Sequence, residues 1–351
     1  MLKSFSSYSL ALWLGLSGLG GCNPFDRMEA YQTERFALSA SPAAPDGYQM
    51  VIFTGTFHRS DGRTFPVPSG HRLISSWQGS GISWAVGDAE QPAPDSLALV
   101  WYSTTEDKFY EGHFQMPQQR IHALLKAGFW NTEDQEQETY DELTVLAGLK
   151  GMAVVWLTGS KNRVLIGRFQ AQETASRFPN QSSQEHAQML QEERAELSPA
   201  VQQEIREGTI SAKRWEDYLR VYPWRIAFNH PLKLYNYGLD YLNGERTNYP
   251  ATRDMSQYAR GVLDPSPKSV PRDLDLFVET EAGQRYEIRV VAFNESETMA
   301  AFQTLYQIDA QAPINLMVEF DKPMRKVQLL VENRLQKIPL ASTKVEMYAA
   351  D

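Results

Sequence analysis

Cysteine is almost absent from this chain of 351 residues, which contains a single one, Cys22. One thiol cannot form a disulfide within the chain, so the fold has to rest on its hydrophobic cores. After residue 22, no apolar run approaches the roughly 20 residues that span a bilayer. The formal net charge of −9 argues against nucleic acid as a main partner. A soluble body long enough for two cores therefore remains.

The single cysteine ends an N-terminal apolar segment. Lys3 and the run "SLALWLGLSGLGG" (9–21) have the charge and length of a secretory signal peptide. Leu19, Gly20 and Gly21 precede Cys22 and resemble the lipobox of bacterial lipoproteins. The alternative is a cleaved signal beside an incidental cysteine. We expect residues 1–21 to be removed and Cys22 to carry lipid, whose acyl chains contribute about 0.8 kcal/mol per buried CH₂ to membrane attachment.

The residues that follow predict where the protein is held. Asn23 after Cys22 favours the outer membrane, facing the periplasm, by analogy with enterobacterial sorting. The segment 22–46, which ends near "SASPAAPDG", reads as a flexible tether between lipid and body. Apart from the covalent lipid, the sequence predicts no cofactor.

Beyond the tether, the two ends of the chain show the same order of patterns. Residues 97–117 and 151–169 read as strand pairs on either side of a helix that stops at Gly128. Residues 274–293 and 314–334 repeat this arrangement around a helix for which Ser296 is placed as the cap. We predict a β-rich α+β protein with two similar domains (47–175 and 223–351), each strand, strand, helix, strand, strand. The alternative is two unrelated domains that both use hairpins.

A charged helical segment lies between the halves. Residues 176–222 contain the capping-box spacing Ser182 and Glu185, and a second start at Ser198 and Pro199. This composition predicts a solvated helical connector. A partner-binding arm is the alternative.

The search for catalytic or metal-binding patterns finds little. The six histidines include no HExxH pattern and no metal-ligand spacing. G-x-S-x-G is absent after residue 22, and Ser80 and Ser83 are only weak nucleophile candidates beside a glycine-rich turn. Acidic residues are plentiful, but nothing singles out a catalytic pair. The sequence therefore predicts a protein that is not an enzyme and that holds no metal.

Aromatic residues are abundant, and most should fill the cores. The stretch 224–250 is richer in them than a core requires, and tyrosine and tryptophan are common at interface hot spots. We therefore take Trp77, Tyr235, Tyr237, Tyr241 and Tyr249 as candidate partner-binding residues. The loops 77–81 and 131–139 are candidate plugs.

Part of the sequence resembles a known family. The lipobox, "PDSLALVWYSTTEDKFYEGHFQMP" (94–117), the short helix after it and "GMAVVWLTGSKNRVLIGRF" (151–169) resemble bacterial lipoproteins known only by a domain of unknown function. The resemblance covers residues 95–171 most clearly and transfers no catalytic residue. Members are often encoded beside type VI secretion phospholipase effectors and are similar to immunity proteins.

This resemblance implies a function for the whole chain. We expect a periplasm-facing immunity protein that binds a secreted phospholipase toxin and occludes it without catalysis. A structural or assembly lipoprotein of the envelope is the alternative, and an enzyme with an unrecognised site is a third class. The identity of the partner distinguishes the first two.

Overall fold

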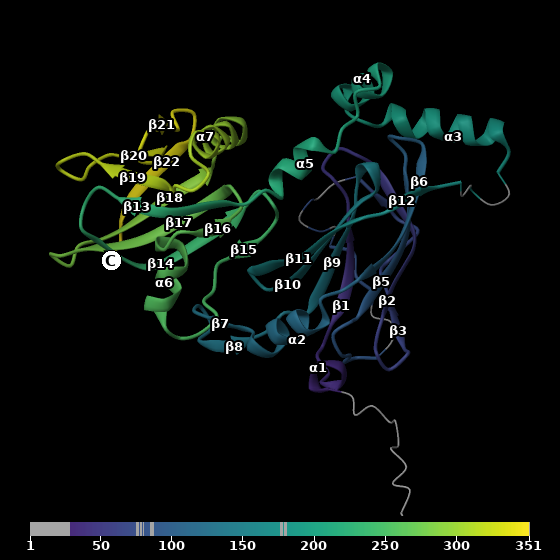
Figure 1. Cartoon of the computed structure of the whole chain (residues 1–351), viewed down its shortest axis with the longest axis horizontal. Coiled ribbons are helices and arrows are strands. Elements are labelled where there is room, and N and C mark those ends of the chain that lie inside the picture. Colours follow the sequence, from purple (N-terminus) through teal and green to yellow (C-terminus); the bar gives the residue numbers. More distant parts are fainter. Residues whose placement is uncertain are drawn as a thin grey trace, which may run out of the picture.

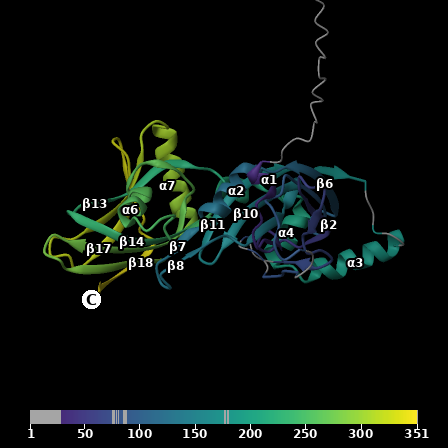
Figure 2. The same cartoon turned by 90° about the horizontal axis from the view of Figure 1, so that it is seen from below.

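The structure is a computed structural model, and it describes residues 29–74, 77, 79, 81–84, 88–175, 178 and 181–350. The predicted signal peptide 1–21 and Cys22 lie outside the described residues. The body has two lobes, which lie end to end along its long axis (Figures 1 and 2). We call residues 29–174 the N half and the part from residue 222 onward the C half.

Three of the helices lie within the segment 176–222, for which the sequence predicts a helical connector. The helices are α1 (Ala30–Thr33), α2 (Gln118–Ala127), α3 (Ser183–Ala195), α4 (Pro199–Glu207), α5 (Lys213–Tyr218), α6 (Met255–Leu263) and α7 (Glu295–Ile308), with a short 3₁₀ turn at Leu149–Gly151. The predicted capping box is present, because Ser182 and Glu185 each bond the other's backbone N–H. The predicted cap of α7 is wrong, since Asn294 and not Ser296 accepts the Glu297 N–H. Among the described residues, no helix is long and apolar enough to cross a membrane.

The strands form three larger sheets and a hairpin. The nine-stranded sheet runs β1 (Ser39–Ala43), β9 (Glu142–Ala147), β10 (Met152–Gly159), β11 (Asn162–Gln170), β15 (Arg246–Thr247), β14 (Leu232–Tyr241), β17 (Pro271–Thr280), β18 (Arg285–Ala292), β22 (Lys344–Ala350). The six-stranded sheet holds β12 (Gln172–Thr174), β6 (Lys108–Gln115), β5 (Ser96–Ser103), β2 (Met50–His58) and β3 (Thr64–Pro66), with β4 (Arg72–Leu73) on β2. The five-stranded sheet holds β16 (Ser266–Lys268), β13 (Tyr222–Phe228), β19 (Ile314–Phe320), β20 (Val327–Glu332) and β21 (Lys337–Pro339). The hairpin is β7 (Phe129–Asn131) with β8 (Glu136–Glu138).

The two halves repeat one pattern of strand pairing. In the N half, β1 is parallel to β9, and β10 and β11 follow antiparallel, while β2, β5, β6 and β12 form a second, antiparallel series. In the C half, β13 is parallel to β19, and β20 and β21 follow, while β14, β17, β18 and β22 form the second series. The β-rich α+β class is confirmed. The predicted order of strands and helix is also present in both halves, and the repeat extends beyond it.

One sheet connects the halves. The first series of the N half and the second series of the C half join through the short strand β15. Arg163 of β11 pairs with Arg246 of β15, which in turn pairs with Asp240 of β14. We call this junction the seam. The division into separate domains at residues 175 and 223 stays a prediction, because the sheet is continuous across it.

The tether predicted for residues 22–46 is wrong for its second part. Residues 39–43 form β1, which pairs in parallel with β9 at the edge of the nine-stranded sheet. Ala40, Ala43 and Ala44 are buried, because small side chains fit closely against the neighbouring strands. The body therefore begins many residues earlier than the composition suggested.

Candidate functional site

The predicted aromatic binding face is mostly interior. Trp77, Tyr237, Tyr241 and Tyr249 are buried, which corrects their prediction as an exposed hot spot. For the β14 tyrosines the cause is strand alternation: from Tyr237 to Tyr241 every second residue is buried, and a register shift between Leu234 and Asn236 takes Tyr235 out of this alternation. Tyr235 lies on the other face, half-buried, with the Arg285 guanidinium 5.5 Å from its ring.

Two of these tyrosines nevertheless share a pocket. A pocket of about 320 Å³ lies at the junction of the two halves. Its walls include Phe129, Tyr140, Asn162 and Val164 from the N half, and Tyr237, Thr247, Tyr249 and Tyr258 from the C half. We call it the seam pocket. The structure thus brings Tyr237 and Tyr249 together, whereas Tyr235, Tyr241 and Trp77 do not line this pocket.

Hydrogen bonds fix the walls of the seam pocket. The rings of Tyr237 and Tyr258 stack with centroids 4.2 Å apart. The Tyr258 hydroxyl donates to the carbonyl oxygens of Tyr237 (2.8 Å) and Thr247 (3.1 Å). Across the seam, the Asn162 amide donates to the Tyr249 carbonyl and accepts the Tyr249 N–H, both at 2.9 Å. Burial raises the pKa of Tyr237 and Tyr258, so both phenols are neutral. The pocket is a mainly aromatic recess with one cationic residue, Arg246, in its lining, and it is suited to a side chain of a partner.

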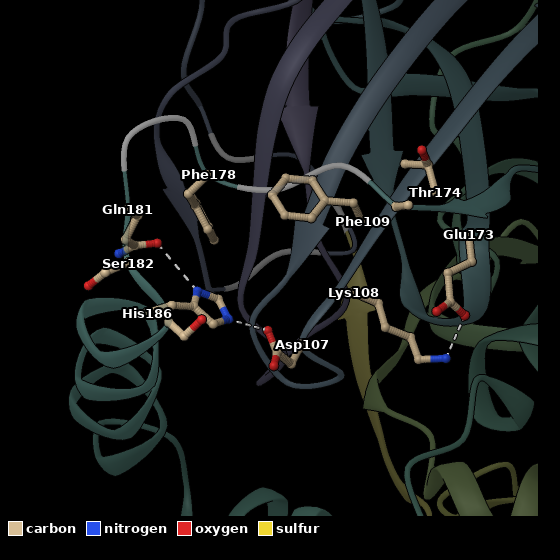
Figure 3. A pocket seen from close by; sticks show the side chains of 11 residues that line it. Asp107, Lys108, Phe109, Glu173, Thr174, Phe178, Gln181, Ser182 and His186 are labelled. Atoms are coloured by element: carbon tan, nitrogen blue, oxygen red, sulfur yellow. Dashed lines mark hydrogen bonds and ion pairs between the residues drawn. The ribbon is translucent and has the colours of Figure 1, made fainter.

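A second pocket, of about 400 Å³, lies where α3 begins, and Figure 3 shows its side chains. His186 Nε2 is 2.7 Å from Asp107 Oδ1, and His186 Nδ1 is 3.3 Å from Gln181 Oε1. The Tyr102 hydroxyl donates to the same Asp107 oxygen at 2.6 Å. We call this the helix pocket. Its polar groups connect the β5–β6 turn to α3.

The geometry of the helix pocket favours docking of the helix over catalysis. An Asp–His pair can serve a nucleophile only through a free ring nitrogen. Here both ring nitrogens of His186 face oxygens of Asp107 and Gln181, and the Ser182 hydroxyl caps α3. Burial raises the pKa of Asp107, but the bonds from Tyr102 and His186 outweigh burial and leave that pKa lowered. The Asp107 carboxylate therefore holds α3 in place.

The remaining sequence candidates do not come together. Ser83 lies exposed on a loop, and Ser80 falls outside the described residues. The candidate plug 131–139 forms the β7–β8 hairpin. There, carboxylate oxygens of Asp134, Glu136 and Glu138 lie within 4.8 Å of one another. The Asn131 side-chain amide donates hydrogen bonds to Asp134 and Glu138, so these acids take part in the hydrogen bonding of the hairpin.

Sequence reasoning missed the Asp107–His186 contact. These residues lie 79 positions apart, one in a polar turn and the other in the charged connector. Neither position carries a spacing signal, because only the fold brings the turn and the helix together.

Comparison with known proteins assigns a family. A family of proteins of unknown function, DUF2931, matches residues 26–212, which is more than half of the chain. The chain belongs to the DUF2931 family. The DUF2931 region contains the N half with α3 and α4, and it stops before α5. It includes β1, in agreement with the place of that strand in the sheet. No match is found among curated proteins or among solved structures.

Proposed function

We propose that this DUF2931 protein is a lipid-anchored immunity protein of the bacterial envelope, which binds a secreted phospholipase toxin and occludes it without catalysis. The observation that carries the proposal is the seam pocket, a rigid aromatic recess near the middle of an elongated body. Such recesses receive the anchor residues of protein partners. The lipobox at Cys22 supports the location, and the occupied ring of His186 supports binding over hydrolysis.

The short link to the anchor supports this arrangement. Helix α1 begins at Ala30, and an extended chain covers at most about 3.5 Å per residue, so Cys22 lies within roughly 28 Å of the body. A lipid on Cys22 would hold the side of the body that carries α1 against the headgroups. In Figure 1, α3 and α4 lie at the opposite end of the N half, where they would face the periplasm. A toxin that approaches the membrane would meet the body before its substrate.

The proposed function is tested by whether the protein protects cells from the toxin. Cells that secrete the toxin into the periplasm should survive when they express this protein and die without it. Equal killing in both cases would exclude immunity. Purified protein should also inhibit the toxin's cleavage of phospholipid vesicles at a one-to-one ratio, because occlusion needs one binder per toxin.

A matched pair of variants tests the pocket. Ala251 is exposed and lines the seam pocket, so Ala251→Trp should fill it and lower toxin affinity by tenfold or more. Ala187 is exposed on α3, away from this pocket, and Ala187→Trp should leave the affinity unchanged. Equal affinity in the two variants would place the contact elsewhere. Recovery of a resident envelope protein in place of a toxin, from a pull-down, would support the assembly role instead.

A further inference from the structure

Arg163 is a buried cation at the seam that lacks a hydrogen-bond partner. Its side chain is 1% exposed. Among the described residues, none accepts a hydrogen bond from its Nε, Nη1 or Nη2 atoms. Its neighbours on β11 are paired across the seam: Asn162 bonds Tyr249, and the Leu165 N–H donates to the Glu245 carboxylate at 3.0 Å. The unpaired guanidinium is thus a local exception within a well-bonded junction.

The Arg163 guanidinium lies over the indole ring of Trp156. Its Cζ atom lies 4.3 Å from the ring centroid of Trp156. This ring is fixed in turn, because Trp156 Nε1 donates to the Asn243 carbonyl oxygen at 2.9 Å. Stacking uses only the face of a guanidinium, whereas its five N–H donors point outward in its plane. Contact with the indole therefore uses none of these donors, and no described residue accepts a hydrogen bond from them.

The nearby acids are already engaged. Glu142 accepts hydrogen bonds from Ser41 (2.6 Å) and Thr144 (2.9 Å). The Oδ2 atom of Asp240 lies 3.6 Å from Arg246 Nε and 3.5 Å from Arg272 Nη2. Burial, and then repulsion from Arg246, lowers the pKa of Arg163 to about 9, so the group stays charged at neutral pH. A buried charge in this state strongly favours an added anion.

Trp77 supplies a second donor beside the same ring. Its indole packs edge to face on Trp156, with centroids 5.3 Å apart. Within the described part of the chain, Trp77 Nε1 has no acceptor, although the side chain is buried. Gly244 allows this approach, since a Cβ there would lie 3.3 Å from Trp77 Nε1. The indole N–H of Trp77 and the guanidinium of Arg163 can only donate hydrogen bonds. Both groups therefore need an acceptor.

We propose that Arg163 and Trp77 form a receptor for a small oxyanion, a carboxylate or a phosphate, at the seam. Two parallel N–H groups of a guanidinium match the two oxygens of either group. The anion would neutralise the buried charge and relieve its repulsion from Arg246 on β15, the C-half strand that pairs with β11. Its binding would stabilise the junction of the two halves.

Thermal unfolding of the full-length protein at constant ionic strength tests the receptor. Inorganic phosphate or acetate should raise the melting temperature, and well above the dissociation constant each tenfold increase in anion should add about 1.4 kcal/mol of stability. A response to acetate alone identifies a carboxylate site, and a response to phosphate a phosphate site. No response to either anion overturns the proposal.

Variants on one strand provide the control. Arg163→Met should melt at a higher temperature without anion and lose the anion response, whereas Arg163→Lys should bind at least tenfold more weakly because it lacks the fork. Arg168→Met, at an exposed site on β11, should keep the full response. A retained response in Arg163→Met overturns the proposal. If that variant does not fold, the Arg163 Nε–H resonance of the unaltered protein should shift and saturate with added anion, and a constant resonance counts equally against it.

Discussion

The N half and the C half share their strand pairing but bury their strands differently. In β9 of the N half, residues from Leu143 to Ala147 are each 1% exposed or less, so both faces are covered. In β19 of the C half, Ile314, Leu316 and Val318 are buried, while the residues between them are half-exposed. The same topology thus supports an enclosed strand in one half and a one-sided strand in the other.

The difference arises from what surrounds each strand. Around β9 and β10, Trp101 of the six-stranded sheet donates to the Gly148 carbonyl, and Trp156 contacts Trp77 and the C-half residue Asn243. Helix α3 also packs on the N half, where its Glu193 side chain is buried and accepts a hydrogen bond from Gln49. The comparison teaches that a duplicated pattern of strand pairing does not fix where the sequence can tolerate polar residues.

The largest expected effect distinguishes the two kinds of strand. Leu146→Ala in β9 should lower the free energy of unfolding by about 2–5 kcal/mol, because Leu146 is fully buried. Met317→Ala in β19 should cost about 1 kcal/mol or less, since that side chain is half-exposed. Leu316→Ala, on the buried face of β19, serves as the control and should again cost about 2–5 kcal/mol. Urea unfolding measures all three, and equal losses for Leu146 and Met317 would contradict the comparison.

A smaller effect concerns the contact between α3 and the N half. The Glu193 carboxylate accepts hydrogen bonds from Gln49 (2.8 Å) and Thr104 (3.1 Å) and pairs with Arg72 (2.8 Å). Glu193→Ala removes the acceptor that these three side chains share and should cost about 1–3 kcal/mol. Protease cleavage within α3 should also become faster. The exposed neighbour provides the control: Glu192→Ala should change stability by less than about 0.5 kcal/mol.

The smallest effect is a pH dependence of the helix pocket. The folded pKa of Asp107 lies below its ordinary value of 3.8. Its contribution to stability is therefore present above pH 3.8 and is lost as the pH falls through the lower folded value. Because the pair is partly exposed, Asp107→Asn should cost about 1 kcal/mol or less near neutral pH. This cost should shrink as the pH falls below 3.8, and chemical denaturation across that range would reveal a constant cost if the assignment is wrong.

Local signals predicted the elements well. The hairpins, the α2 stop at Gly128 and the Ser182 capping box each depend on residues close in sequence. Strand β1 was missed, because a proline-containing stretch of small residues resembles a linker until a distant strand pairs with it. The tyrosines of β14 were read as surface, although alternation places Tyr237 and Tyr241 inside. Arg163 carried no comparable signal, because the apolar residues that follow it, 164–166, occupy both faces of β11.

The parallel pairing of β1 with β9 has a consequence for how the chain folds. Ser39 meets Glu142, so the first strand must wait for the synthesis of a partner on the order of a hundred residues later. The C half repeats this delay, because β13 waits for β19. Closing such long loops before any contact forms is slow, so each half should remain open until its second hairpin exists. A nascent chain stalled before residue 142 would therefore display the unpaired edge of β1 to chaperones and proteases.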